Sequence, residues 1–196
     1  MRVAGVDGTK GGWVAMVVED GAFAGDAVLR PVETDFAELG QVDVIGIDVP
    51  IGFGPRVADS AARAYLKGAA SVVFPTPPRA VLERPFGPGL GVSAQAHALG
   101  DRIRWITDLA EGDDRLREVH PEVSFRAMNG AQPLRHRKQS SGGALERMQL
   151  LRDEGIVLRR LDAAGAAPLD DVLDAAAAAW SAHKIATGTA RSLPDP

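Results

Sequence analysis

Short apolar runs, separated by turns rich in glycine or charged residues, fill the first 50 residues of the chain. Runs of this length and pattern are typical of β-strands. The predicted strands span residues 3–7, 13–18, 22–29 and 42–49. A short helix at 34–39, with Thr34 or Asp35 as its N-cap, separates the last two strands. The tight turns between the first three strands predict an antiparallel meander.

The rest of the chain combines helical periodicity with proline-rich segments. Helices are predicted at residues 57–68, 93–109, 142–154 and 170–187. Residues 74–79 contain three prolines and are expected to form a stiff, extended loop. A short strand is predicted at 116–120, after which Pro121 opens a helical turn. The pattern predicts an α/β protein: a mixed five-stranded sheet, antiparallel in its first three strands and parallel afterwards, flanked by helices.

The composition is that of an ordinary folded protein. The 196 residues are 45% hydrophobic and 24% charged, which makes wholesale disorder improbable. No linker divides the sequence, so we expect a single domain over residues 1–190 and a loose tail at 191–196. Residues 1–7 lack the apolar segment of a signal peptide, and no apolar run reaches 18 residues. We therefore expect a cytoplasmic protein that does not associate with membranes.

Charge and cysteine content exclude several kinds of site. The absence of cysteine rules out disulfides, thiolate zinc sites and a cysteine nucleophile. A net charge of -4 argues against a broad nucleic-acid-binding face, but a local basic patch or a metal ion could still bind phosphates.

Two carboxylates end apolar strands. Asp7 closes the first predicted strand and Asp48 lies near the end of the fourth. Each could simply hydrogen-bond the amides of the turn that follows. If both point to the same edge of the sheet they need a counter-ion, and a divalent cation would serve both.

Two further acids, Asp171 and Asp174, lie one turn apart on one face of the last predicted helix. Acids in a first helical turn stabilise the helix dipole, which accounts for Asp171. It accounts less well for Asp174, because the residues that follow are almost all alanine and a buried carboxylate there needs a partner.

The segment around residue 120 concentrates polar chemistry. Strand alternation would place Glu118 and His120 on one side, with Glu122 just beyond. Three interpretations remain open: added metal ligands with His120 as ligand or general acid–base, substrate positioning by Glu122, and a salt-bridged surface strand.

Basic residues could contact a phosphate. The densest basic run is 135–138, in which Arg137 and Lys138 could form a mobile clamp over the acids. Arg79 could be an ordered phosphate contact at the end of the proline-rich loop. The basic run at 135–138 could equally be a solvated loop.

Five segments together resemble one bacterial and archaeal family, domain of unknown function 429. The segments are Gly5-Val6-Asp7-Gly8-Thr9-Lys10-Gly11-Gly12-Trp13, Ile47-Asp48-Val49-Pro50-Ile51-Gly52, Ser71-Val72-Val73-Phe74-Pro75-Thr76-Pro77-Pro78-Arg79, Glu118-Val119-His120-Pro121-Glu122-Val123-Ser124-Phe125 and Asp170-Asp171-Val172-Leu173-Asp174-Ala175. The family commonly has Cys where this chain has Thr9. The resemblance covers about residues 1 to 187 and implies a predicted nuclease with a ribonuclease-H-like fold.

Within that fold, Asp7, Asp48, Asp171 and Asp174 match the four acids of junction-resolving nucleases, which hold two Mg²⁺ or Mn²⁺ ions. The resemblance thus implies a metal-dependent nuclease or phosphodiesterase, with a nucleic acid or a nucleotide as substrate. Glu118 would be an added metal ligand.

Two other functions stay open. The chain could be a non-catalytic ribonuclease-H-like protein that binds a ligand or partner. The stretch Asp7-Gly8-Thr9-Lys10 also resembles the first phosphate loop of actin-like sugar kinases. In that case Lys10 would bind a phosphate group of the substrate. Those enzymes need two such domains, so a homodimer would have to complete the site.

Overall fold

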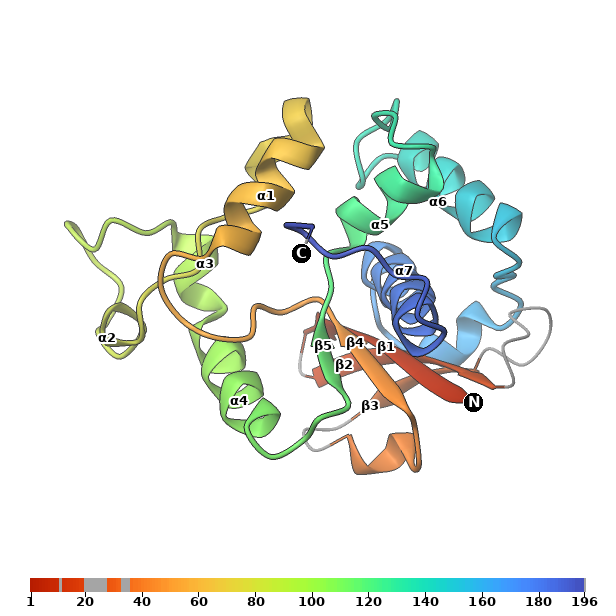
Figure 1. Cartoon of the computed structure of the whole chain (residues 1–196), viewed down its shortest axis with the longest axis horizontal. Helices are drawn as coiled ribbons and strands as arrows, with labels where there is room; N and C mark the ends of the chain where they lie inside the picture. Colours follow the sequence, from red (N-terminus) through yellow and green to blue (C-terminus); the bar gives the residue numbers. More distant parts are fainter. Residues whose placement is uncertain (11, 20–27, 33–35, 196) are drawn as a thin grey trace. The chain divides into compact units, whose positions relative to one another are not determined.

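The computed structural model describes residues 1–10, 12–19, 28–32 and 36–195 (Figure 1). These residues form two compact units. The first comprises Met1–Asp48 and Arg115–Ala190, and the second comprises Val49–Asp114 and Arg191–Pro196. The expectation of a single domain over 1–190 stays a prediction.

A mixed β-sheet forms the centre of the first unit. Its strands are β1 (Arg2–Thr9), β2 (Gly12–Glu19), β3 (Val28–Val32), β4 (Val44–Ile47) and β5 (Leu116–Glu118). They lie in the order β3-β2-β1-β4-β5. The pairs β1–β2 and β2–β3 are antiparallel, whereas β1–β4 and β4–β5 are parallel. The prediction of an α/β protein is thus confirmed.

The predicted strand and helix boundaries differ from the observed ones in the first unit. Residues 22–27 of the predicted third strand lie outside the described residues, as do the predicted caps Thr34 and Asp35. What the structure describes of the predicted helix is a single 3-10 turn, η1 (Ala37–Leu39). The strand predicted over residues 42–49 is shorter in the structure, where β4 spans Val44–Ile47.

Helix α7 (Leu169–Ala186) packs directly on the sheet, because glycine replaces side chains where the two meet (Figure 1). A Cβ at Gly5 of β1 would lie 1.9 Å from the backbone nitrogen of Ala179. A Cβ at Gly46 of β4 would lie 2.6 Å from the carbonyl oxygen of Ala178. The alanines at 175–179 and 182 of α7 are fully buried, so the helix backbone lies close to the sheet.

Two more helices pack against α7: α5 (Pro121–Met128) and α6 (Ser141–Asp153). Phe125, Leu151 and Leu173 from these three helices are fully buried in the same core. A 3-10 turn, η3 (Leu161–Ala164), precedes α7. The side chain of Ser140 caps α6 by accepting a hydrogen bond of 3.0 Å from the Gly143 amide.

The second unit is helical. It contains α1 (Val57–Leu66), η2 (Lys67–Val72), α2 (Arg79–Leu82), α3 (Ala94–Ala98) and α4 (Gly100–Ala110). Ser93 caps its helix as expected, accepting a hydrogen bond of 3.1 Å from the Ala96 amide. The prediction of one continuous helix over 93–109 is wrong, since α3 ends at Ala98 and α4 begins at Gly100. Leu99 separates the two helices. Glycine is a poor helix residue, which favours a break at this point.

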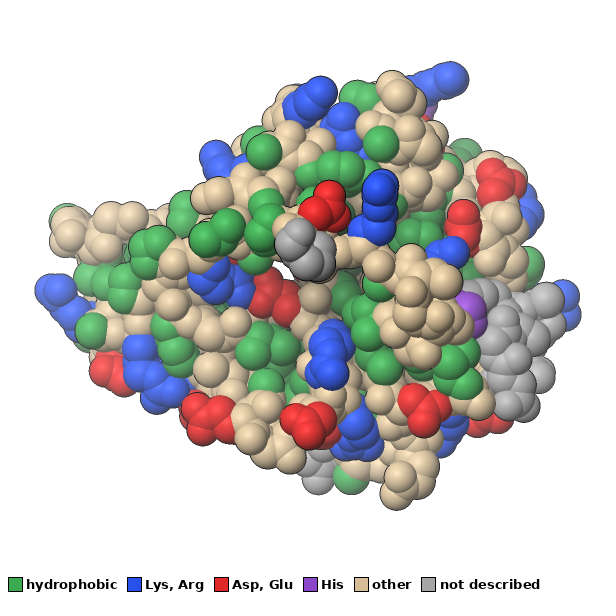
Figure 2. Space-filling view, viewed as in Figure 1, with side chains coloured by type: hydrophobic (Ala, Val, Ile, Leu, Met, Phe, Trp, Pro, Cys, Tyr) green, Lys and Arg blue, Asp and Glu red, His purple; other side chains and the backbone are tan. Residues whose placement is uncertain are grey.

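Residues 74–78 are irregular, as their prolines predicted, but Arg79 begins α2 rather than ending the loop. Among the described residues, no helix is both long and apolar enough to cross a membrane. Figure 2 shows one face of the molecule, on which basic and acidic side chains are interspersed.

Candidate metal centre

Three carboxylates meet at one edge of the sheet, and we call them the acidic triad: Asp7, Asp48 and Asp174. Each offers one oxygen, and these oxygens all lie within 4.8 Å of one another. Asp7 and Asp174 are buried, with 8% and 2% of their surface exposed, whereas Asp48 is half-buried. The structure therefore brings together three of the four acids that the sequence singled out.

The register of two parallel strands positions Asp7 beside Asp48. Val6 of β1 pairs with Ile47, the last residue of β4, and the residue that follows each of them in the chain is an aspartate. The Asp48 amide continues this pairing by donating a hydrogen bond of 3.1 Å to the Val6 carbonyl. The Asp7 carboxylate accepts 2.7 Å from the Gly8 amide, which is the turn contact expected from the sequence.

The third acid comes from α7. Asp174 lies in the second turn of this helix, immediately before the alanines that pack on Gly5 and Gly46. Because nothing larger than hydrogen separates the helix backbone from those strands, the Asp174 carboxylate reaches the strand ends. Small residues at the helix–sheet contact are thus what completes the triad.

Burial and mutual repulsion make the triad costly to ionise. Burial, and then the charge of Asp174, raise the pKa of Asp7 well above its usual value. Burial and the charges of Asp7 and Asp174 do the same for the pKa of Asp48. The pKa of Asp174 rises to about 6, because burial outweighs the opposing effect of the Lys138 ammonium. Such a group of acids is stabilised by a cation.

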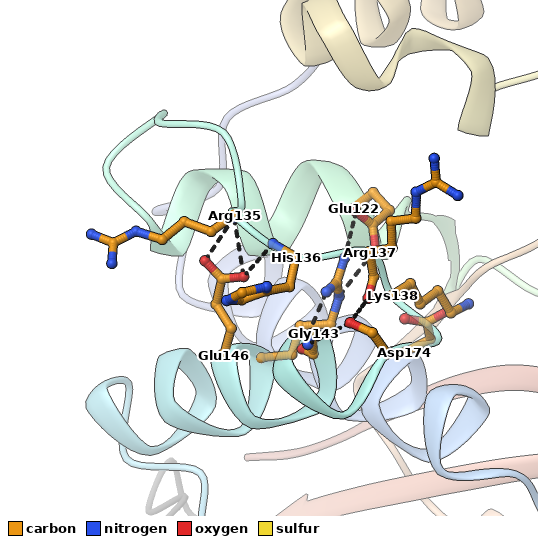
Figure 3. A network of polar contacts seen from close by, with 10 residues as sticks. Glu122, Arg135, His136, Arg137, Lys138, Gly143, Glu146 and Asp174 are labelled. Atoms are coloured by element: carbon orange, nitrogen blue, oxygen red, sulfur yellow. Dashed lines mark hydrogen bonds and ion pairs between the residues drawn. The ribbon is translucent and has the colours of Figure 1, made fainter.

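Lys138 supplies one positive charge to the triad. Its ammonium forms a hydrogen-bonded ion pair with Asp174 Oδ2 (Figure 3). Burial disfavours the charged lysine, but Asp174, Asp7 and Asp48 overcome this effect and raise the pKa of Lys138 above its usual range. The other oxygen of that carboxylate, Asp174 Oδ1, is buried and accepts no hydrogen bond from the described residues.

The loop that carries Lys138 is fastened to α6 (Figure 3). The Glu146 carboxylate accepts hydrogen bonds of 2.9 and 3.1 Å from the Arg135 amide and one of 3.1 Å from the His136 amide. At the other end, the carbonyl of Arg137 accepts 2.8 Å from the Ser140 hydroxyl. A Cβ at Gly143 would lie 2.0 Å from that carbonyl oxygen. The expected mobile clamp is therefore held at both ends by hydrogen bonds.

Glu122, an expected substrate contact, already has a protein partner. Its two oxygens accept hydrogen bonds of 2.6 and 2.9 Å from Nη2 of Arg147. Arg147 is only 2% exposed, and its Nη1 donates 3.2 Å to the Gly143 carbonyl. The pair links α5 to α6, and the contact of Arg147 with Gly143 stabilises the first turn of α6. Glu122 therefore has a structural role.

Glu118, Asp171 and His120 do not belong to the set of ligand atoms that lie within 4.8 Å of one another. The charge of Glu118, which is exposed at the end of β5, contributes to the raised pKa of Asp48. Asp171 contributes in the same way to the raised pKa of Asp7. The predicted alternation of Glu118 and His120 on one strand is wrong, because β5 ends at Glu118 and His120 is the N-cap residue of α5. Pro121, fixed at the first helical position, imposes that change.

For the other basic candidates, no ion pair with an acid of the triad is seen among the described residues. Lys10 is exposed after β1, and Arg137 is exposed beside Lys138. Arg79 belongs to the second unit, where it forms an ion pair of 2.7 Å with Asp108 and lies 4.5 Å from the centre of the Phe53 ring.

Sequence reasoning missed the residues that hold Lys138 in place: Gly143, Glu146 and Arg147. A glycine pair after a helix N-cap was visible at 142–143 and could have indicated a close approach of backbone. Nothing in the sequence distinguishes the buried Arg147 from the exposed Arg152 of the same helix.

The donor set fits a hard divalent cation. All three ligands that the triad offers are carboxylate oxygens, which Mg²⁺ and Mn²⁺ prefer over softer metals. The buried, unpartnered Asp174 Oδ1 is also a position that a cation would satisfy.

A family model described as a protein of unknown function, DUF429, matches residues 5–196, and the chain belongs to this family. No curated protein matches the chain. No solved structure matches it either.

Proposed function

We propose that this protein is a ribonuclease-H-like, metal-dependent phosphodiesterase that hydrolyses a phosphate ester in a nucleic acid or a nucleotide. The observation that carries the proposal is the acidic triad, whose three carboxylate oxygens lie within 4.8 Å of one another in a largely buried position. A protein gains nothing in stability from three mutually repelling buried acids, so their convergence favours a function.

The topology supports the fold assignment. An antiparallel β3-β2-β1 meander continued by the parallel strands β4 and β5 is the arrangement expected for a ribonuclease-H-like sheet. The triad also comes from the elements expected to carry the acids of that fold: the first strand, the end of the fourth and the last helix.

The acidic and basic residues would have different roles in this reaction. Asp7, Asp48 and Asp174 would hold Mg²⁺ or Mn²⁺, which supplies Lewis-acid activation of water and stabilises developing charge on the phosphate. Lys138 would direct an ammonium hydrogen toward a phosphate oxygen while it remains bound to Asp174. Glu118 and Asp171, at the margin of the triad, would hold water molecules in place. Exposed Arg137 and Lys10 would attract the anionic substrate.

The test is metal-dependent hydrolysis of an activated phosphodiester and of single-stranded DNA, duplex DNA, RNA and cyclic nucleotides. We expect turnover that requires Mg²⁺ or Mn²⁺ and is abolished by EDTA. Asp7→Asn should lower it by about 100- to 1000-fold, the effect of several kcal/mol of lost transition-state stabilisation.

The matched control is Asp153→Asn, which makes the same change at an exposed position in the last turn of α6 and should retain full activity. A folded protein that binds Mn²⁺ at the triad yet hydrolyses none of these substrates would argue for a non-catalytic binding protein instead.

A further inference from the structure

A lysine side chain places a positive charge at the acidic triad. The Lys138 ammonium binds Asp174 Oδ2, and its charge also favours the ionised forms of Asp7 and Asp48. The lysine side chain is two-thirds buried, since 34% of its surface is exposed. Lys138 is therefore part of the centre rather than a surface lysine that happens to pass near an acid.

The two oxygens of Asp174 have different surroundings. Oδ2 is occupied by Lys138, whereas Oδ1 is buried and accepts no hydrogen bond from the described part of the chain. A metal ion that binds to the triad can thus use Oδ1 without displacing the lysine. A second ion that bridges the same carboxylate would have to take Oδ2 and expel the ammonium.

The surrounding structure keeps Lys138 where it is. Glu146 fixes the start of its loop through two backbone amides, and Ser140 fixes the end through the Arg137 carbonyl. Gly143 lets that carbonyl approach α6 closely. These contacts fix the loop backbone from which the lysine side chain extends, and the ion pair with Asp174 holds its ammonium at the triad.

We propose that the centre binds a single divalent cation and that the Lys138 ammonium takes the place of a second one. This inference rests on the proposed function, and it revises the two-ion arrangement that the family resemblance implied. Three carboxylates, one divalent ion and one ammonium together carry no net charge, which a partly buried site favours. Two divalent ions beside the same lysine would leave an excess of positive charge on the triad itself, with only Glu118 and Asp171 at its margin to offset it.

This arrangement leaves the lysine free to contact substrate. An ammonium has three hydrogens, and Asp174 takes one of them. Lys138 also lines an open pocket of about 250 Å³, together with Ser140 and Ser141 at the start of α6 and Leu169 and Asp170 at the start of α7. A phosphate group that enters that pocket would contact Lys138.

The test is the Mn²⁺ stoichiometry, measured by calorimetry and by electron paramagnetic resonance. We expect the wild-type chain to bind one Mn²⁺ with the spectrum of an isolated ion. Lys138→Met should bind two, with the broadened spectrum of a spin-coupled pair, because it vacates Asp174 Oδ2. Arg137→Met, the matched loss of the exposed neighbouring charge, should still bind one Mn²⁺ with the spectrum of an isolated ion.

A spin-coupled pair in the wild-type protein would overturn the inference and leave the proposed function standing. The inference is equally overturned if Lys138→Met still binds one ion, or if Arg137→Met also gains a second. Absence of any Mn²⁺ at the wild-type triad would defeat both proposals, whereas one ion without hydrolysis would defeat the proposed function alone. If Lys138→Met does not fold, the wild-type stoichiometry and that of Lys138→Arg, which should remain at one, decide the question.

Discussion

Asp7 and Asp48 lie side by side because β1 and β4 run parallel with Val6 opposite Ile47. The register that aligns two apolar strands also places two acids next to each other at the same edge of the sheet. Their carboxylates are therefore close enough to repel each other. Repulsion between them contributes to the raised pKa of Asp48. The stability of the metal-free protein should reflect this unfavourable contact.

Asp7→Asn should therefore stabilise the metal-free protein at neutral pH. The amide keeps the size of the side chain and removes one of the repelling charges from a buried site. We expect a rise in the free energy of unfolding of about 1–2 kcal/mol, measured by urea denaturation in EDTA. Asp153→Asn should change it by less than about 0.5 kcal/mol. A marked loss of stability in Asp7→Asn would instead show that the contact with the Gly8 amide outweighs the repulsion.

The stability of the metal-free protein should fall as the pH rises. The pKa of Asp174 is about 6 in the folded protein, and those of Asp7 and Asp48 are raised too, so the folded state holds protons that the unfolded chain releases. Stability is then greatest below the unfolded pKa and is lost as the pH rises through the folded values. Asp174 alone should contribute a loss of about 3 kcal/mol between about pH 4 and pH 8.

Unfolding curves at several pH values, with EDTA present, measure this fall. Asp7→Asn should flatten the dependence, because one raised group no longer titrates. Saturating Mn²⁺ should flatten it as well, since it binds the ionised folded state. An equally steep curve in Asp7→Asn would show that groups outside the triad cause the pH dependence.

Arg147→Met should destabilise the protein strongly. It would leave Glu122 as a nearly buried carboxylate that has lost its three hydrogen bonds from Arg147, and would also remove the contact with the Gly143 carbonyl. Breaking one side of a buried ion pair costs about 3–5 kcal/mol. Arg152→Met, an exposed arginine on the same helix, should cost less than about 0.5 kcal/mol. Similar losses for the two variants, measured by urea denaturation, would contradict the assigned role of Arg147.

Gly5→Ala should disrupt both the fold and the triad. Its Cβ would overlap the α7 backbone, 1.9 Å from Ala179 N and 2.2 Å from Ala175 O, and backbone atoms cannot move aside as a flexible side chain can. We expect a loss of about 3 kcal/mol or more, and weaker Mn²⁺ binding in whatever protein remains folded, since Asp174 moves with α7. Gly87→Ala is the control, because no described residue beyond the two chain neighbours comes within 4 Å of the added carbon. Unchanged melting of Gly5→Ala would mean that α7 does not lie this close to β1.

The sequence by itself indicated several of the elements and the acidic residues of the candidate site. Apolar runs indicated β1, β2 and β4, and the acids that end them stood out because a charge interrupts each run. The spacing of Asp171 and Asp174 placed both on one helix face. These are local signals, carried by residues close together in the chain.

Only the tertiary structure decided which of those residues meet. Asp174 joins Asp7 and Asp48 because Gly5 and Gly46 admit α7 to the sheet, and Lys138 joins them because Glu146 and Gly143 fasten its loop. The same packing assigns Glu122 to Arg147 and places His120 at a helix start instead of on a strand. Such outcomes depend on contacts between residues far apart in the chain, so the local pattern of side chains could not determine them.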